Sequence, residues 1–206
     1  MGILTELYYL PNIEYFTAIE GEGVLVIDDC ENFRKQSYRN RTSVLLANKT
    51  ETLSVPVYEG NKQKPYRDIR IDYHQKWLNI HLRGIQSAYG KAPFFEFYFP
   101  YFEQVFRQNV PFLMDLNLKL LTVCLKLLKT NIQVQLLSEA GENHGLRDLR
   151  GVIKAKEDYK SREIYRPSPY NQLFGLDFVP NLSVIDLLFC QGPEAPSIIR
   201  ASKKND

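Results

Sequence analysis

The chain begins with a strand pattern, a helix pattern and a second strand pattern in close succession. Residues 3–10 (ILTELYYL) are predicted to form a strand that Pro11 ends. The next segment, NIEYFTAIE, places apolar residues at helical spacing. Residues 23–29 (GVLVIDD) form a continuous apolar run of the kind that is buried on both faces of a sheet. Two strands joined by one helix predict a parallel βαβ unit, and therefore an α/β fold.

The later patterns add a hairpin, several helices and one more strand. Residues 42–57 alternate around a polar turn at Asn48 and Lys49, which predicts two antiparallel strands. Helical spacing and apolar runs then predict helices at 74–90, 100–108 and 111–130, a strand at 132–137 and a helix within 181–193. A chain of 206 residues is long enough for one core. We expect a single α/β domain, residues 1–206, with a mixed β-sheet flanked by helices.

Three local features give sharper predictions. Pro100 is expected in the first turn of its helix, where its missing N–H costs nothing. Ser183 and Asp186 are expected to form a capping pair at the start of the last helix, which Gly192 ends. Residues 138–169 are polar and are predicted to form a long loop with one helical turn near LRDLR. Loops of this length are usually functional or mobile, and whether this one closes over a site is left open.

Charge and cysteine content bound the environment of the protein. A net charge of +2, with one short basic cluster, is too mild for a nucleic-acid-binding surface. The apolar runs are much shorter than the roughly 18 residues that a membrane span requires. Three widely spaced cysteines, an odd number, indicate free thiols rather than a disulfide framework. We therefore expect a cytoplasmic protein with no membrane span and no nucleic-acid partner; the oligomeric state is left open.

Well-known catalytic and cofactor motifs are missing from the sequence. It has neither the GxxxxGK[ST] nor the GxGxxG pattern, and no GxSxG pattern. No cysteine pair has zinc-site spacing, and the histidines do not stand at the i, i+4 positions of a metalloprotease helix. The sequence thus shows no metal signature, and it does not indicate a cofactor.

The basic run RKQSYRNR, residues 34–41, is the strongest local sign of a binding site. It holds four cations and no acid, although Asp28, Asp29 and Glu31 just upstream could neutralise some of them. The planar fork of arginine suits a two-point grip on phosphate or carboxylate. We therefore predict that this run binds an anion, the alternative being an ordinary solvated turn.

Two polar side chains stand on apolar helix faces. His81 is either a buried histidine that bonds a backbone carbonyl or a general base, because its pKa suits proton transfer. Asn117 lies inside a leucine stripe, where a buried amide needs hydrogen-bond partners, so it either joins a polar network or faces a ligand. The aromatic block at 94–106 is expected to be core rather than a stacking surface.

Six blocks, taken in order, resemble the WbqC-like protein family in the form common among Bacteroidetes-type bacteria. They are YYLPNIEYF, ENFRKQSYRNR, LSVPV, DIRIDYHQKWLNIHLRGIQSAYGKAPFFEFY, LMDLNLKLL and NLSVIDLLFCQGPEA. The resemblance spans residues 7–195, and the order and spacing of the blocks make it specific. It points at these positions: Tyr15, Glu31, Lys35, Gln36, Tyr38, Asn40, Arg41, Trp77, His81, Tyr89, Pro93, Asn117, Asn181, Ser183 and Asp186.

The name of that family comes from a gene context of surface-polysaccharide (O-antigen) synthesis. The resemblance implies an enzyme of surface-glycan or nucleotide-linked metabolism, which we expect to be a group transferase acting on an activated, phosphate- or carboxylate-bearing small molecule. The expected site residues are His81, Asn117 and Glu31 for catalysis and Lys35, Tyr38, Arg39, Asn40, Arg41 and Tyr15 for substrate binding. The βαβ start resembles that of nucleotidyl-transfer folds. The alternative is a non-catalytic interaction protein that docks an acidic partner through residues 34–41.

Overall fold

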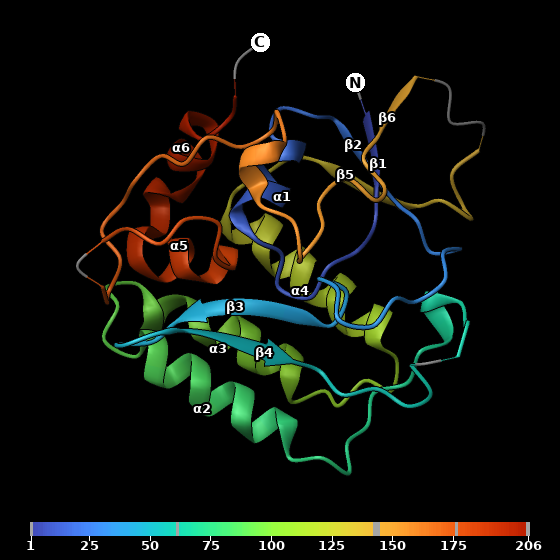
Figure 1. Cartoon of the computed structure of the whole chain (residues 1–206), viewed down its shortest axis with the longest axis horizontal. Coiled ribbons are helices and arrows are strands. Elements are labelled where there is room, and N and C mark those ends of the chain that lie inside the picture. Colours follow the sequence, from blue (N-terminus) through green and yellow to red (C-terminus); the bar gives the residue numbers. More distant parts are fainter. Residues whose placement is uncertain (1, 61, 142–144, 176, 205–206) are drawn as a thin grey trace.

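A four-stranded parallel sheet forms one half of the protein (Figure 1). The structure, a computed structural model, describes residues 2–60, 62–141, 145–175 and 177–204. The strands are β1 (Gly2–Thr5), β2 (Val24–Ile27), β5 (Gln133–Leu136) and β6 (Leu146–Asp148), in the order β5-β2-β1-β6. Helix α1 (Ile13–Ile19) joins the parallel pair β1 and β2. The predicted parallel βαβ unit is therefore confirmed.

The first strand is shorter than the predicted 3–10, because the chain leaves the sheet after Thr5. Residues 6–12 cross the end of the sheet, and the Tyr9 N–H donates to the Tyr38 carbonyl at 2.8 Å instead of to a neighbouring strand. Leu10 turns the chain with a left-handed φ of 43°. Because β1 ends at Thr5, the side chains that follow it lie at the carboxyl end of the sheet.

The predicted hairpin is confirmed as a separate two-stranded sheet. It consists of β3 (Arg41–Leu45) and β4 (Thr50–Ser54), with Arg41 opposite Ser54. The α/β class is thus confirmed. The parallel and antiparallel strands form two separate sheets rather than the one mixed sheet expected, because the hairpin strands pair only with each other. Helix α2 (Trp77–Tyr89) lies against the hairpin (Figure 1).

Helices α3 (Phe95–Phe106) and α4 (Leu113–Leu127) pack against each other and against α5 (Val184–Gln191), which leads into α6 (Ala195–Ala201). The helices predicted at 74–90, at 111–130 and within 181–193 are confirmed. The position predicted for Pro100 was wrong, because α3 begins earlier and holds this proline in its interior. The reason is the buried face of α3, where the Phe95 and Phe102 rings contact Phe189 of α5.

The aromatic block, predicted to be core, is core only in part. Phe95, Phe102 and Phe106 are buried, whereas Phe97 is 68% and Tyr101 43% exposed. In the part of the chain that the structure describes, no helix is both long enough and apolar enough to cross a membrane.

Residues 138–169 contain a strand where a helical turn was predicted. LRDLR supplies β6, which pairs with β1, and the Leu149 N–H donates to the Leu4 carbonyl at 2.8 Å. A buried ion pair then fixes the far end of the segment. Arg162 Nε and Nη2 lie 2.6 and 2.7 Å from the two carboxylate oxygens of Glu14 in α1.

The predicted capping pair at the start of α5 was also wrong. The Ser183 hydroxyl donates to the Leu10 carbonyl at 2.9 Å and does not cap the helix. The Asp186 carboxylate accepts from Tyr170 and Gln172 at 2.5 and 3.1 Å. Tertiary partners thus replace the local bonds. Gly192 ends the helix as predicted, with a φ of 50°.

Candidate functional site

The order of the parallel strands reverses next to β1. The chain visits β1, β2 and β5 on one side and then crosses to β6 on the other side of β1. In open α/β sheets, ligands bind outside the carboxyl ends of the strands at such a reversal. A cavity of about 300 Å³ lies there, and we call it the switch-point cleft. Its lining residues are Glu6, Tyr8, Arg34–Arg39, Gly151 and Ile153–Glu157.

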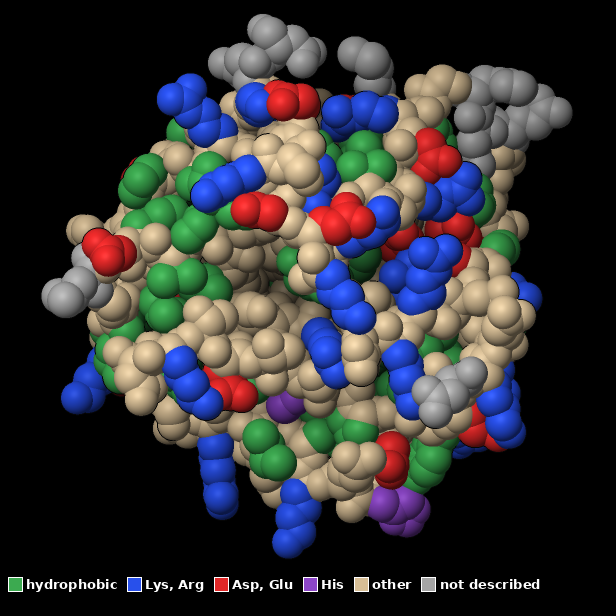
Figure 2. Space-filling model, in the orientation of Figure 1, with side chains coloured by type: hydrophobic (Ala, Val, Ile, Leu, Met, Phe, Trp, Pro, Cys, Tyr) green, Lys and Arg blue, Asp and Glu red, His purple; other side chains and the backbone are tan. Residues whose placement is uncertain are grey.

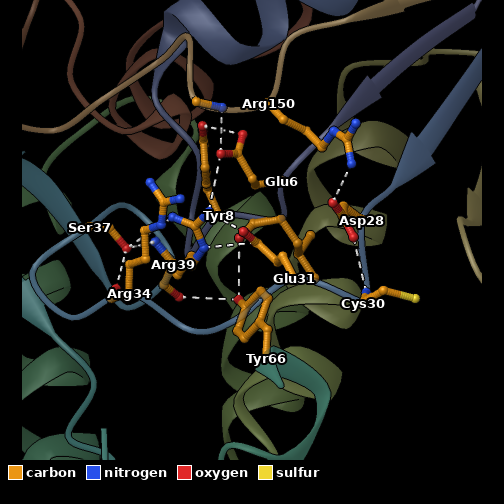
Figure 3. A network of polar contacts seen from close by, with 12 residues as sticks. Glu6, Tyr8, Asp28, Cys30, Glu31, Arg34, Ser37, Arg39, Tyr66 and Arg150 are labelled. Atoms are coloured by element: carbon orange, nitrogen blue, oxygen red, sulfur yellow. Dashed lines mark hydrogen bonds and ion pairs between the residues drawn. The ribbon is translucent and has the colours of Figure 1, made fainter. Parts of the chain in front are cut away.

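Glu6 and Arg39 line the floor of the cleft, and behind them Arg39 also pairs with the half-buried Glu31, which is not a lining residue; we call these three residues the triad (Figure 3). Arg39 Nε donates to Glu31 at 2.8 Å, and Nη2 donates to Glu6 at 3.1 Å and also to the second oxygen of Glu31. The Gly151 N–H donates to Glu6 at 2.7 Å, which joins the segment after β6 to the floor. Protein carboxylates therefore already engage the guanidinium of Arg39.

The acids upstream of the basic run have separate partners. Asp28 pairs with Arg150 at 2.9 Å (Figure 3). Asp29 accepts from the Ser138 hydroxyl at 2.6 Å. Glu31 is thus the upstream acid that neutralises part of the run. The triad combines two carboxylates with one guanidinium.

Burial sets the protonation of the triad. Burial raises the pKa of Glu31, and the hydrogen bond from Arg39 only partly opposes this. Burial disfavours the charged guanidinium as well, but the bonds to Glu31 keep the pKa of Arg39 above its ordinary range. Glu31 therefore binds a proton more readily than an exposed glutamate does, which suits a group that exchanges protons.

Tyrosine rings form one wall of the cleft. The Tyr8 ring lies 5.5 Å from that of Tyr38 and 5.1 Å from that of Tyr15, between ring centroids. The Tyr8 hydroxyl donates to the Ile153 carbonyl at 2.9 Å and so ties the two sides of the cleft together. Tyr15 is buried behind Tyr8 and does not line the cleft.

Exposed cations surround the opening. Arg34 and Lys35 come from the basic run, and Lys154 and Lys156 come from the segment after β6. Lys154 pairs with Glu157 at 2.9 Å, while no carboxylate of the described residues pairs with Arg34 or Lys35. Figure 2 shows Lys and Arg side chains gathered to the right of centre, below a group of acidic side chains. The opening therefore favours an anion.

Comparison with known families agrees with the sequence blocks. The model of the WbqC-like protein family matches residues 7–167 and 159–198. The chain belongs to the WbqC-like protein family. Searches of curated proteins and of solved structures gave no match. Of the positions that carry the resemblance, Lys35, Gln36 and Tyr38 line the cleft.

The WbqC-like basic run divides between two cavities. Lys35, Tyr38 and Arg39 line the switch-point cleft, whereas Asn40 and Arg41 line a neighbouring hollow. Lys35 and Gln36 border both cavities. Gln36 turns the backbone there with a left-handed φ of 57°. The structure thus brings the run to one face but separates its two ends.

His81 lies outside the cleft, buried between α2 and the hairpin. Its Nε2 lies 3.2 Å from the Ser54 carbonyl, which can only accept, so Nε2 carries the proton. Nδ1 then accepts from the Tyr9 hydroxyl at 2.7 Å. Burial lowers the pKa of His81 to about 4. Both ring nitrogens are hydrogen-bonded within the protein, as expected for a buried histidine that bonds a backbone carbonyl, the first of the two interpretations.

We expect His81 to make folding sensitive to acid. The unfolded chain binds a proton at this position below pH 6.5, but the folded protein does so only below about pH 4. Stability is therefore lost as the pH falls through this window, by about 3 kcal/mol for this group. Urea unfolding at several pH values should show a shallower pH dependence for His81→Phe. His74→Gln, which changes an exposed histidine, should keep the wild-type slope; equal slopes for all three proteins would contradict the assignment.

Asn117 lies behind the floor of the cleft. Its Nδ2 donates to the Arg39 carbonyl at 2.7 Å and to the Tyr66 hydroxyl at 2.5 Å. The Tyr66 hydroxyl in turn lies 3.3 Å from the Leu7 carbonyl. The amide thus belongs to a buried network that fixes the backbone on both sides of the triad, and it does not face the cleft.

The lining residues that the sequence analysis missed include Glu6, Tyr8, Lys154 and Lys156. A signal for Glu6 and Tyr8 would have been a strand ending at Thr5, because residues just after a parallel strand lie at its carboxyl end. Within the described residues, no group of three or more His, Cys, Asp or Glu side chains could hold a metal ion.

Proposed function

We propose that this WbqC-like protein is a group transferase that binds an anionic, activated substrate in the switch-point cleft. The observation that carries this proposal is the position of the cleft, at the strand-order reversal and between two groups of exposed cations. The resemblance to a family named from surface-polysaccharide synthesis favours a nucleotide-linked or glycan substrate. Its phosphate or carboxylate would face the cations, and its less polar part would lie on the Tyr8 and Tyr38 rings.

Each residue then has a distinct role. Lys35, with Arg34 and Lys154, binds the anion. Arg39 orients Glu31 rather than binding substrate, because its Nε and Nη2 already donate to Glu31 and Glu6. Glu31 is the proton-transfer group in place of His81, since burial raises its pKa and its side chain is 14% exposed. His81 and Asn117 support the surrounding backbone.

Thermal unfolding with added ligands tests this function. Pyrophosphate, nucleotides and nucleotide sugars are screened against the full chain. A ligand at roughly 100 times its dissociation constant adds about 2.7 kcal/mol, which raises the melting temperature by about 5–10 °C for a chain of this size. We expect a phosphate compound to give this shift and Lys35→Ala and Lys154→Ala to reduce it.

A matched control separates a site from general charge effects. Lys119→Ala removes an exposed lysine of α4 that does not line the cleft, and the shift should stay unchanged. With a ligand identified, Glu31→Gln should keep the shift but lose turnover. If no phosphate compound shifts the melting temperature, the proposal fails and the interaction protein that docks an acidic partner becomes the better hypothesis.

A further inference from the structure

A second hollow lies beyond Lys35 and Gln36 as seen from the switch-point cleft. Its volume is about 370 Å³, and we call it the Arg41 hollow. Its lining residues are Lys35, Gln36, Asn40, Arg41, Ser54–Val57 and Gln75. They come from the end of the basic run, from the end of β4 and the residues after it, and from the turn before α2. Lys35 and Gln36 form the wall that the two cavities share.

The hollow is positively charged. Arg41 and Lys35 supply two cations, and no acidic side chain is among the lining residues. In the described part of the chain, neither cation pairs with a carboxylate. Cross-strand pairing with Ser54 fixes the backbone of Arg41 at the start of β3. This rigid placement distinguishes Arg41 from a solvated surface arginine.

Two buried polar atoms of residues that line the Arg41 hollow have no hydrogen-bond partner among the described residues. Asn40 is 8% exposed, and its Nδ2 donates to the Val55 carbonyl at 3.0 Å, which fixes the orientation of the amide. Its Oδ1 then has no donor, and the neighbouring Arg41 Nε has no acceptor. A buried polar group without a partner is costly. One unused acceptor and one unused donor therefore stand on adjacent residues.

We propose that the Arg41 hollow binds a small carboxylate that also carries a hydroxyl or amino donor. The carboxylate accepts from the Arg41 guanidinium, whose fork suits its two oxygens, and Lys35 adds charge. The hydroxyl or amino group donates to Asn40 Oδ1. The dianion of a phosphate monoester fits less well, because its phosphate oxygens can only accept and would face the Asn40 oxygen unfavourably. The volume of the hollow suits a small ligand.

The Arg41 hollow is a binding site separate from the switch-point cleft, and it also suggests where the acceptor of the proposed group transfer binds. Group transfer requires an acceptor as well as an activated donor, and the hollow lies across a single wall from the cleft. The carboxylate ligand would thus be the acceptor, a step that rests on the proposed function. Binding of the carboxylate does not depend on that step, so the two proposals can fail separately.

Three matched probes test the site on the full chain by calorimetric titration. Glycolate carries both the carboxylate and the hydroxyl, acetate lacks the hydroxyl, and glycolamide lacks the charge. We expect glycolate to bind about 2- to 10-fold more tightly than acetate, the usual effect of one added hydrogen bond. Glycolamide should not bind detectably. Absence of glycolate binding, or equal binding of all three probes, would overturn the proposal.

Variants assign the binding to the hollow. Arg41→Gln should weaken glycolate binding about 10-fold or more. Arg41→Lys keeps the charge but loses the fork, so its affinity for glycolate should lie between those of wild type and Arg41→Gln. Arg83→Gln, an exposed arginine of α2 outside the lining, should change nothing. Lys154→Ala should leave glycolate binding unchanged and weaken binding of the phosphate compound in the cleft. Arg41→Gln should weaken glycolate binding and leave binding of the phosphate compound unchanged. Glycolate binding unaffected by Arg41→Gln would overturn the assignment even if the cleft binds its phosphate ligand.

Discussion

Replacement of Arg162 by alanine should lower the free energy of unfolding by about 3–5 kcal/mol. Arg162 donates through two nitrogens to Glu14, whose side chain is fully buried within α1. Removal of the guanidinium leaves a carboxylate without its cation in the core, and the remaining bond from Asn181 Nδ2, at 3.1 Å, cannot replace it. Urea unfolding at neutral pH measures the change directly.

The ion pair also holds one wall of the switch-point cleft. The segment from Ile153 to Glu157 lies between β6 and Arg162, so the pair anchors this segment to α1. Arg166→Ala is the matched control, because Arg166 is exposed and lies only four positions along the chain. It should change stability by less than about 0.5 kcal/mol.

A double variant tests whether the unpaired carboxylate of Glu14 causes the loss of stability in Arg162→Ala. Glu14→Gln combined with Arg162→Met removes both charges, and it should recover part of the stability lost in Arg162→Ala. If Arg162→Ala is no less stable than Arg166→Ala, the ion pair contributes nothing to folding.

Those parts of the fold that depend on local pattern could be predicted from the sequence. The apolar run of β2 and the spacing in α1 required a parallel βαβ unit, and the turn at Asn48 and Lys49 required a hairpin. The errors fell where tertiary contacts override local preference. Pro100 is tolerated on the exposed side of α3 because Phe95 and Phe102 bury the other face of this helix. LRDLR becomes a strand because β1 offers it an open edge.

The site was less predictable, because its key pairings join distant segments. The basic run identified Arg39 but not Glu6, which lies 33 positions earlier in the chain. The sequence could not separate Arg39 from Arg41, although the first is paired and buried and the second lines a different cavity. For His81 and Asn117, the sequence left two alternatives open, and the hydrogen bonds to Tyr9 and Tyr66 favour the buried network in both cases.

Replacement of Arg39 by methionine should also cost about 3–5 kcal/mol at neutral pH, and this loss should shrink in acid. The variant leaves Glu6 and Glu31 buried without their cation, so burial and mutual repulsion raise the pKa of Glu31 further. The folded variant then holds a proton at pH values above 4.5, where the unfolded chain has released it. Its stability falls as the pH rises through that window.

The decisive measurement is the difference in unfolding free energy between wild type and Arg39→Met at about pH 5 and about pH 8. A smaller difference at the lower pH is the result that two buried carboxylates require. Arg34→Met is the matched control, because Arg34 is exposed in the same run and has no carboxylate partner among the described residues. It should be close to wild type at both pH values. A loss for Arg39→Met that does not change with pH would mean that Arg39 stabilises the fold by packing, and Glu31 would then lose its role as the proton-transfer group.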